Sequence, residues 1–454
     1  MKFTMKPSTQ KIALILTALA IQANAQTKPI KIKKTTLDLT YGGILAGDAS
    51  EYGWPAAFGY IWETNIAKSK QKFYVNFNSK QLLVGSFTQA WWGIECTAAK
   101  KCTVNATNPI TLNINNVQVT TNTISAPLQF GKSGTLPEAS AFYAVAGNPF
   151  DYVGDAGFGF GSLFWYNVRT AAKSKDPLSI KFTLKGQKTL EGNMIVYDRD
   201  IGNLNATLTL LSDPPKNPID AIPLVSSGRT YSASYGITGA TVTLPYSPPK
   251  FGTKPTPPEN NIITLVKSTG RICIAPQLPY VFVAALDQDT QTQILDTYAA
   301  TVCPDAKNEE DLKQKCTKIK SAPTFTFNIG KQKFTIKGNE WVYTYKTGTV
   351  GIKAIKMQQV TPAVGVFAPG APCEGAIFAL GRNFFTKYSL TIQSVDFDLE
   401  TYKIGISPNS GGLGWLLWVI VIVVVVIAIA GGVFFFLRKG KGDENGGFSQ
   451  PLNN

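Results

Sequence analysis

Carboxylates, lysines, hydroxyls and six cysteines are the side chains that could do chemistry in this 454-residue chain, because it contains no histidine. Without an imidazole there can be no Ser-His-Asp or Cys-His nucleophile and no His-containing zinc site. Any hydrolytic chemistry must therefore rest on carboxylates, lysine or hydroxyl groups. The sequence predicts no metal site and no cofactor.

The N-terminal residues 1–25 have the pattern of a secretory signal. A basic start is followed by the apolar run 12–21 and by the small-x-small sequence Ala23-Asn24-Ala25. The apolar run is too short to span a bilayer, which disfavours the alternative of an uncleaved anchor. We expect cleavage before Gln26.

Residues 415–437 predict a transmembrane helix, since these 23 residues carry no charge. At about 1.5 Å per residue they reach about 34 Å, enough for the hydrocarbon layer. Arg438, Lys439 and Lys441 follow directly, which places that flank in the cytoplasm. We expect a single-pass type I protein at the cell surface or in an endomembrane, with a linker at 409–414 and a cytoplasmic tail at 438–454.

All six cysteines lie in the portion expected to be exported, where disulfides form. They are Cys96, Cys102, Cys273, Cys303, Cys316 and Cys373. Metal binding is the alternative, but no Cys-x-x-Cys pair occurs. The sequons that begin at Asn105 and Asn205 predict N-glycans.

The net charge of +15 comes mostly from scattered lysines rather than from an arginine-rich stripe with interleaved aromatic residues. This pattern is typical of a solvated surface, and it makes nucleic acid an unexpected partner for an exported domain. Affinity for acidic glycans stays open.

Short alternating segments bounded by turn residues predict a mainly β ectodomain. Clear strands are expected at 73–77, 179–184 and 324–329, and helices at 281–300 and 309–319. The Pro-rich residues between 247 and 260 predict an exposed loop or linker.

Three stretches, in this order, resemble segments of the pepsin family of aspartic proteases. The first is Leu82-Leu83-Val84-Gly85-Ser86 and the residues up to 92, which is similar to the family's first Asp-Thr-Gly-Ser segment. The second begins with Ser268-Thr269-Gly270 and is similar to the second Asp-Thr-Gly motif. The third, which contains Leu380 and Gly381, resembles the closing Ile-Leu-Gly segment.

The resemblance implies a bilobal pepsin-like fold with an N-terminal lobe at 26–246 and a C-terminal lobe at 261–408. It also implies the disulfides Cys96–Cys102 and Cys316–Cys373, and it leaves Cys273–Cys303 as the third pair. Asp155-Ala156-Gly157 resembles a further segment of the first lobe, Asp-Gly-Ile-Leu-Gly-Leu.

The resemblance places Leu83 and Ser268 where the family has its two catalytic aspartates. Leucine cannot transfer a proton, and a serine hydroxyl without a base is a poor nucleophile. The sequence therefore predicts a non-catalytic, membrane-anchored protein that binds a peptide, protein or glycan ligand. The alternatives are an aspartic-type endopeptidase with an atypical catalytic pair, or another carboxylate-pair enzyme such as a glycosidase.

Overall fold

A computed structural model describes the chain as two units, residues 1–407 and residues 408–454, and each is treated by itself. The described residues are 33–43, 58–84, 102–114, 117–131, 134–146, 154–173, 176–184, 205–225, 233–248, 257–265, 270–278, 281–284, 287–307, 311, 321–329, 332–347, 357–362, 364–365, 373–396, 400–409 and 422–429.

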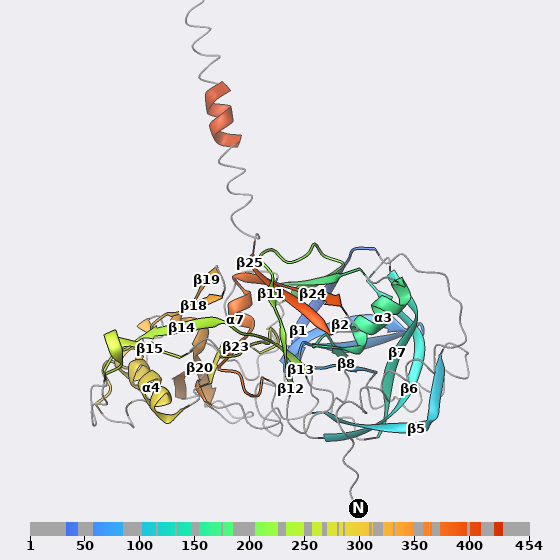
Figure 1. Ribbon diagram of the computed structural model, residues 1–454, viewed down its shortest axis with the longest axis horizontal. Coiled ribbons are helices and arrows are strands. Elements are labelled where there is room, and N and C mark those ends of the chain that lie inside the picture. The colour runs from blue at the N-terminus through green and yellow to red at the C-terminus, as the bar shows by residue number, and fades with distance from the viewer. Residues whose placement is uncertain are drawn as a thin grey trace, which may run out of the picture. The chain divides into compact units, whose positions relative to one another are not determined.

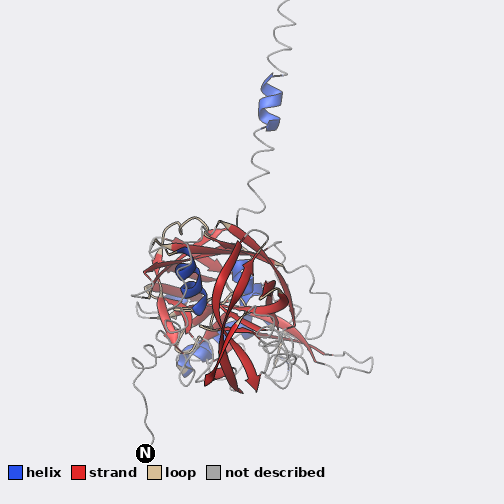
Figure 2. Ribbon diagram, turned by 90° about the vertical axis from the view of Figure 1, so that its right-hand side faces the viewer, coloured by secondary structure: helices blue, strands red, loops and turns tan. Residues whose placement is uncertain are grey.

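The first unit is mainly β, as predicted (Figures 1 and 2). Its largest sheet has 13 strands in the order β11-β25-β24-β9-β10-β1-β2-β3-β8-β4-β7-β6-β5. The bounds are β1 Thr35–Gly43, β2 Phe58–Ile66, β3 Ser69–Asn76, β4 Leu82–Val84, β5 Thr103–Ile114, β6 Val117–Phe130, β7 Gly134–Ala146, β8 Gly154–Gly157, β9 Leu178–Leu184, β10 Ala206–Leu210, β11 Ile219–Asp220, β24 Tyr388–Asp396 and β25 Thr401–Pro408.

Three smaller sheets come from the middle and later parts of the chain. One has the order β12-β13-β16-β23-β17-β22, the next has β15-β14-β18-β19, and the last pairs β20 with β21. The bounds are β12 Ile222–Val225, β13 Ala233–Ile237, β14 Ala240–Pro245, β15 Ile262–Thr264, β16 Ile272–Ile274, β17 Phe282–Ala284, β18 Phe325–Ile329, β19 Gln332–Ile336, β20 Val342–Thr347, β21 Met357–Pro362, β22 Val364–Gly365 and β23 Phe378–Leu380.

The strands predicted from alternation at 73–77, 179–184 and 324–329 correspond to β3, β9 and β18. Their inward side chains join one large core. Trp62 stacks on Phe130 with ring centroids 5.3 Å apart, and both are buried. Aromatic pairs of this kind add roughly 0.5–1.5 kcal/mol to the free energy gained from burial alone.

Among its described residues, the first unit has few helices. They are α3 Leu163–Ala172, α4 Gln288–Val302, α6 Gly338–Trp341, α7 Arg382–Phe385 and the 3-10 turn η1 Glu259–Asn261. The helix predicted over 281–300 is wrong at its start, because strand β17 occupies 282–284. The helix begins after Asp287, whose Oδ1 accepts a hydrogen bond of 2.7 Å from the Thr290 N–H. This N-cap satisfies one of the free N–H groups of the first turn. Most of 309–319 lies outside the described residues.

One disulfide joins Cys273 in β16 to Cys373, with the two Cα atoms 5.5 Å apart. The predicted pairs Cys316–Cys373 and Cys273–Cys303 are therefore wrong. Strand β16 lies parallel to β23, and the turn that leads into β23 brings Cys373 beside Cys273. Cys102 and Cys303 are also disulfide-bonded. Cys96 and Cys316 lie outside the described residues, so Cys96–Cys102 stays a prediction.

The two ends expected from the sequence fall mostly outside the described residues, the signal at 1–25 entirely so. Of 415–437 the structure describes residues 422–429, which are helical. No helix among the described residues is long and apolar enough to cross a bilayer.

Candidate functional site

Leu83 lies in the middle of the short strand β4, within the sheet. Strand β7 runs parallel to β4 on one side, with Phe142 opposite Leu83, and β8 runs antiparallel on the other, with Asp155 opposite Leu83. Leu83 has no exposed surface. The structure thus places this alkyl side chain at a buried strand position next to a buried acid.

Only some of the other predicted site residues lie in the part of the chain that the structure describes. Leu380 is the last residue of β23 and Gly381 precedes α7, and Gly270 lies just before β16. The remaining ones lie outside the described residues: Gly85, Ser86, Ser268 and Thr269. Asn105 lies within β5 and Asn205 directly before β10, and both are partly exposed.

Asp155 is the one acidic residue that is fully buried among the residues the structure describes. Its Oδ2 accepts a hydrogen bond of 2.7 Å from Nε2 of Gln81. Burial raises the pKa of the Asp155 carboxyl to about 7, although hydrogen bonding from Ser79, Gln81 and Asn76 acts in the opposite direction. The desolvation of the charged form outweighs the effect of these neutral partners.

The segment between β3 and β4 holds these polar partners in a compact turn. The Asn78 N–H donates to Oδ1 of Asn76 at 2.9 Å, and the Gln81 N–H donates to Oγ of Ser79 at 3.2 Å. Asn and Ser side chains commonly bond the backbone two residues further on, which favours turns over strands. The sequence from Asn76 to Gln81 therefore ends strand β3 and directs the Gln81 amide toward Asp155.

Two glycines allow the strand β8 and the residues after it to approach this turn closely. The Gly157 N–H donates to the Gln81 carbonyl at 2.7 Å, and the Gly159 N–H donates to the Ser79 carbonyl at 2.9 Å. A Cβ at Gly157 would lie 2.5 Å from the carbonyl oxygens of Ser79 and Gln81. At Gly159 it would lie 2.4 Å from the carbonyl of Ala233. Only glycine permits this backbone packing.

Asn78 joins the turn to strand β13. Ser234 donates from Oγ to Oδ1 of Asn78 at 2.7 Å, and the Ala233 N–H donates to the Asn78 carbonyl at 2.9 Å. Both Asn78 and Ser234 are buried. The polar site therefore combines a turn of the large sheet with a strand of the six-stranded sheet.

Sequence reasoning did not single out Asn78, Gln81 or Ser234. The sequence held a signal for Asn78 and Gln81. They belong to the polar run Asn78–Gln81 which, together with Asn76, separates the apolar residues of β3 from those of β4. The sequence held no such signal for Ser234, since its role depends on the position of β13 in the fold.

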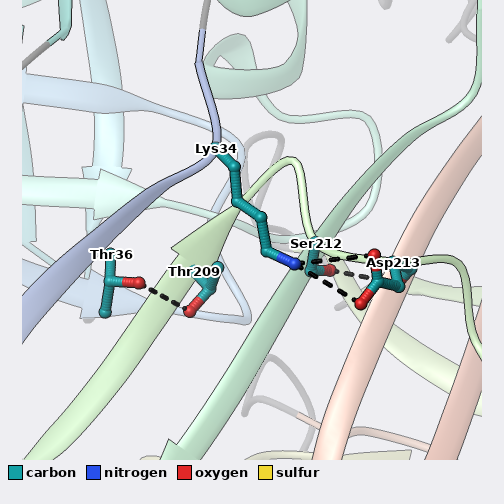
Figure 3. A network of polar contacts seen from close by, with 5 residues as sticks. All are labelled: Lys34, Thr36, Thr209, Ser212 and Asp213. Carbon is teal, nitrogen blue, oxygen red and sulfur yellow. Dashed lines mark hydrogen bonds and ion pairs between the residues drawn. The ribbon is translucent and has the colours of Figure 1, made fainter.

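Asp296 in α4 is partly buried, and burial raises the pKa of its carboxyl. Several other carboxylates in the described part lie at the surface. Asp213 is an example: its side chain is 93% exposed and 3.4 Å from Nζ of Lys34, beside the Thr36–Thr209 contact (Figure 3). Glu63 bonds Lys70 and Lys72, which lower the pKa of its carboxyl. Exposed pairs of this kind add little stability. No group of three or more potential metal ligands occurs within the described ranges.

The arrangement offers one buried carboxyl among neutral amide and hydroxyl groups. General acid–base hydrolysis by carboxylates uses two such groups, whose proximity separates their pKa values. Asp155 has neither a buried acidic neighbour in the described residues nor solvent exposure.

Comparisons with known proteins gave one kind of match. No family model and no curated protein matches the chain. Among solved structures, the chain is similar to the aspartic proteinase from Irpex lacteus, with 11% sequence identity and a TM-score of 0.46. The match covers 84% of this chain and 99% of that one.

Proposed function

We propose that the chain is a membrane-anchored protein with a pepsin-like ectodomain that binds a ligand and does not cleave it. The observation that carries this proposal is the isolation of Asp155, whose carboxyl is bonded by Gln81 and lies opposite Leu83. In the described residues no second buried carboxylate accompanies it.

The sequence supports the same conclusion at both positions that resemble catalytic half-sites. Leu83 offers an alkyl group and Ser268 a hydroxyl. Neither side chain supplies a carboxylate to the pair that shares one proton in aspartic proteases. A turn that is held by side-chain hydrogen bonds serves binding as well as catalysis, since both need fixed geometry. The ligand class that fits an inactive protease-like ectodomain is a peptide, a protein or a glycan.

Membrane anchoring is supported by the 23 uncharged residues at 415–437. In the described part of this stretch, apolar side chains face outward along the helix, with Val424 58% and Ile427 65% exposed. An apolar helical surface of this kind is stable in hydrocarbon rather than in water.

A proteolysis assay tests the proposal. The full-length chain, purified in detergent, is incubated with denatured protein between about pH 3 and pH 7, the range in which a carboxylate pair would work. We expect no cleavage above the buffer control, with or without pepstatin. Pepstatin-sensitive cleavage that copurifies with the protein would overturn the proposal.

The variant Asp155→Asn provides the matched control. If cleavage occurs and this variant abolishes it, Asp155 takes part in an atypical catalytic pair. If cleavage occurs and survives in the variant, a different pair or a contaminating protease is responsible, and active-site labelling of the purified band separates these two.

A further inference from the structure

Arg382 is a buried cation without an acidic partner among the described residues. It is the first residue of α7 and only 1% of its surface is exposed. Its Nε and Nη1 atoms have no hydrogen-bond partner. The ion pairs found in the described part involve exposed lysines at other places.

Two tyrosines of the large sheet lie beside the guanidinium. The Cζ atom of Arg382 is 5.5 Å from the centroid of the Tyr41 ring, which is a cation–π distance. Tyr41 in β1 and Tyr60 in β2 are directly paired, and their ring centroids are 5.1 Å apart. The Tyr60 hydroxyl is buried beside the Arg382 guanidinium, and it makes no hydrogen bond of standard geometry.

These tyrosines do not supply the missing negative charge. Burial raises the pKa of Tyr41 to about 12, and it raises the pKa of Tyr60 further, although Arg382 lowers both. Both phenols are therefore neutral near pH 7. The ring faces offer the guanidinium a partial compensation only, since a cation–π contact is weaker than an ion pair with a buried counter-charge.

A buried charge without a counter-charge is strongly destabilising, and native proteins rarely leave several buried polar atoms unpaired at one place. An oxyanion would supply the missing negative charge and would pair at least one of these donors. It could accept hydrogen bonds from one edge of the guanidinium and from the Tyr60 hydroxyl, and charge-assisted bonds to guanidinium are among the strongest in proteins. The planar guanidinium matches a carboxylate better than it matches a spherical ion.

We propose that Arg382, with Tyr41 and Tyr60, forms a binding site for a small carboxylate anion. The site lies where Arg382 of α7 meets Tyr41 of β1 and Tyr60 of β2. It does not depend on whether the ectodomain lacks peptidase activity. Because Arg382 is almost fully covered, the anion must be small or must present its carboxylate on a narrow extension.

Thermal unfolding tests the site. The full-length chain in detergent is heated at pH 7.5 in increasing sodium acetate, with ionic strength held constant by sodium chloride, and tryptophan fluorescence is followed. We expect the midpoint to rise with the logarithm of the acetate concentration above its Kd, by about 5 °C at about 100 times the Kd, because the ligand stabilises only the native state. Triglycine and triglycine amide form further arms: the first carries a carboxylate on an extended chain and the second carries none.

The variant Arg382→Met should unfold at the same midpoint at every acetate concentration. Replacing a buried charge by an apolar side chain is often neutral or stabilising, so this variant should fold. Arg169→Gln is the matched control. It removes another buried arginine, whose Nη2 donates to the carbonyl and Oγ of Ser394 at 3.0 and 3.2 Å, and it should keep the response to acetate.

An equal response in the wild type and in Arg382→Met, or no response of the wild type to either acetate or triglycine, would overturn the proposal. If Arg382→Met does not fold, saturation-transfer NMR on the wild type decides. A signal on the acetate methyl group that formate suppresses and chloride does not would support the site. No such signal, or equal suppression by chloride, would refute a carboxylate site. A response to triglycine but not to acetate would assign the carboxylate to a larger ligand.

Discussion

The native state holds a proton on Asp155 over a pH range in which the unfolded chain has released it. The carboxyl has no exposed surface, and burial raises its pKa from 3.8 to about 7. Because the native state binds more protons than the unfolded state between these values, stability falls as the pH rises through this interval. Above about pH 7 both states are deprotonated at this residue and its contribution no longer changes.

We predict that the free energy of unfolding decreases by up to about 4 kcal/mol between about pH 4 and pH 7 because of Asp155. Asp155→Asn should remove this decrease, since an amide is neutral at every pH and can still accept the Gln81 hydrogen bond. Denaturant unfolding of both proteins at several pH values measures the difference.

Asp213→Asn is the control for the pH experiment, because the Asp213 side chain is 93% exposed. It should leave the pH dependence as it is in the wild type. A wild-type profile that rises between pH 4 and pH 7 and is unchanged in Asp155→Asn would contradict the prediction.

Among the elements, the hairpin of β2 and β3 turns through two residues in an unfavourable conformation. Ile66 pairs with Ser69, and the residues between them, Ala67 and Lys68, have φ values of 49° and 66°. Two-residue hairpin turns of this kind favour Asn-Gly, because positive φ brings Cβ too close to the backbone. Core packing of Ala67, which is buried, keeps the turn in place.

Lys68→Gly should therefore raise the free energy of unfolding by about 0.5–1 kcal/mol, since Lys68 is exposed and glycine removes the Cβ clash. Chemical denaturation measures this increase. Lys333→Gly is the comparison, because Lys333 is an exposed residue within strand β19, where glycine should destabilise. A loss of stability in Lys68→Gly as large as in Lys333→Gly would show that the turn is not strained.

At the scale of the whole molecule, the proposed membrane anchor is the uncharged stretch 415–437. The apolar residues between Ile422 and Ile429 are exposed along a helix, and the uncharged stretch extends beyond them on both sides. A charge at the centre of a spanning helix costs about 2.5–3.5 kcal/mol on insertion.

We predict that the full chain stays in the membrane fraction after alkaline carbonate extraction and that a chain ending at residue 414 is released. Val426→Arg, near the centre of 415–437, should shift part of the full chain into the soluble fraction. Val426→Leu keeps the side chain apolar and should not. Release of the wild type by carbonate would disprove the anchor.

Local patterns in the sequence determined much of the secondary structure. Alternation located β3, β9 and β18, because the side-chain period of a strand is set by its own backbone. The start of α4 was missed, although Asp287 three residues before Thr290 is a recognisable cap. The absence of histidine also excluded every mechanism that needs an imidazole, and this conclusion required no structure.

Only the tertiary structure decided which distant residues meet. It paired Cys273 with Cys373, placed Leu83 opposite Asp155, and brought Arg382 over the ring of Tyr41. These contacts depend on the order of strands in each sheet and on where the strand ends lie. That order results from burying the whole core at once, so no local run of residues encodes it.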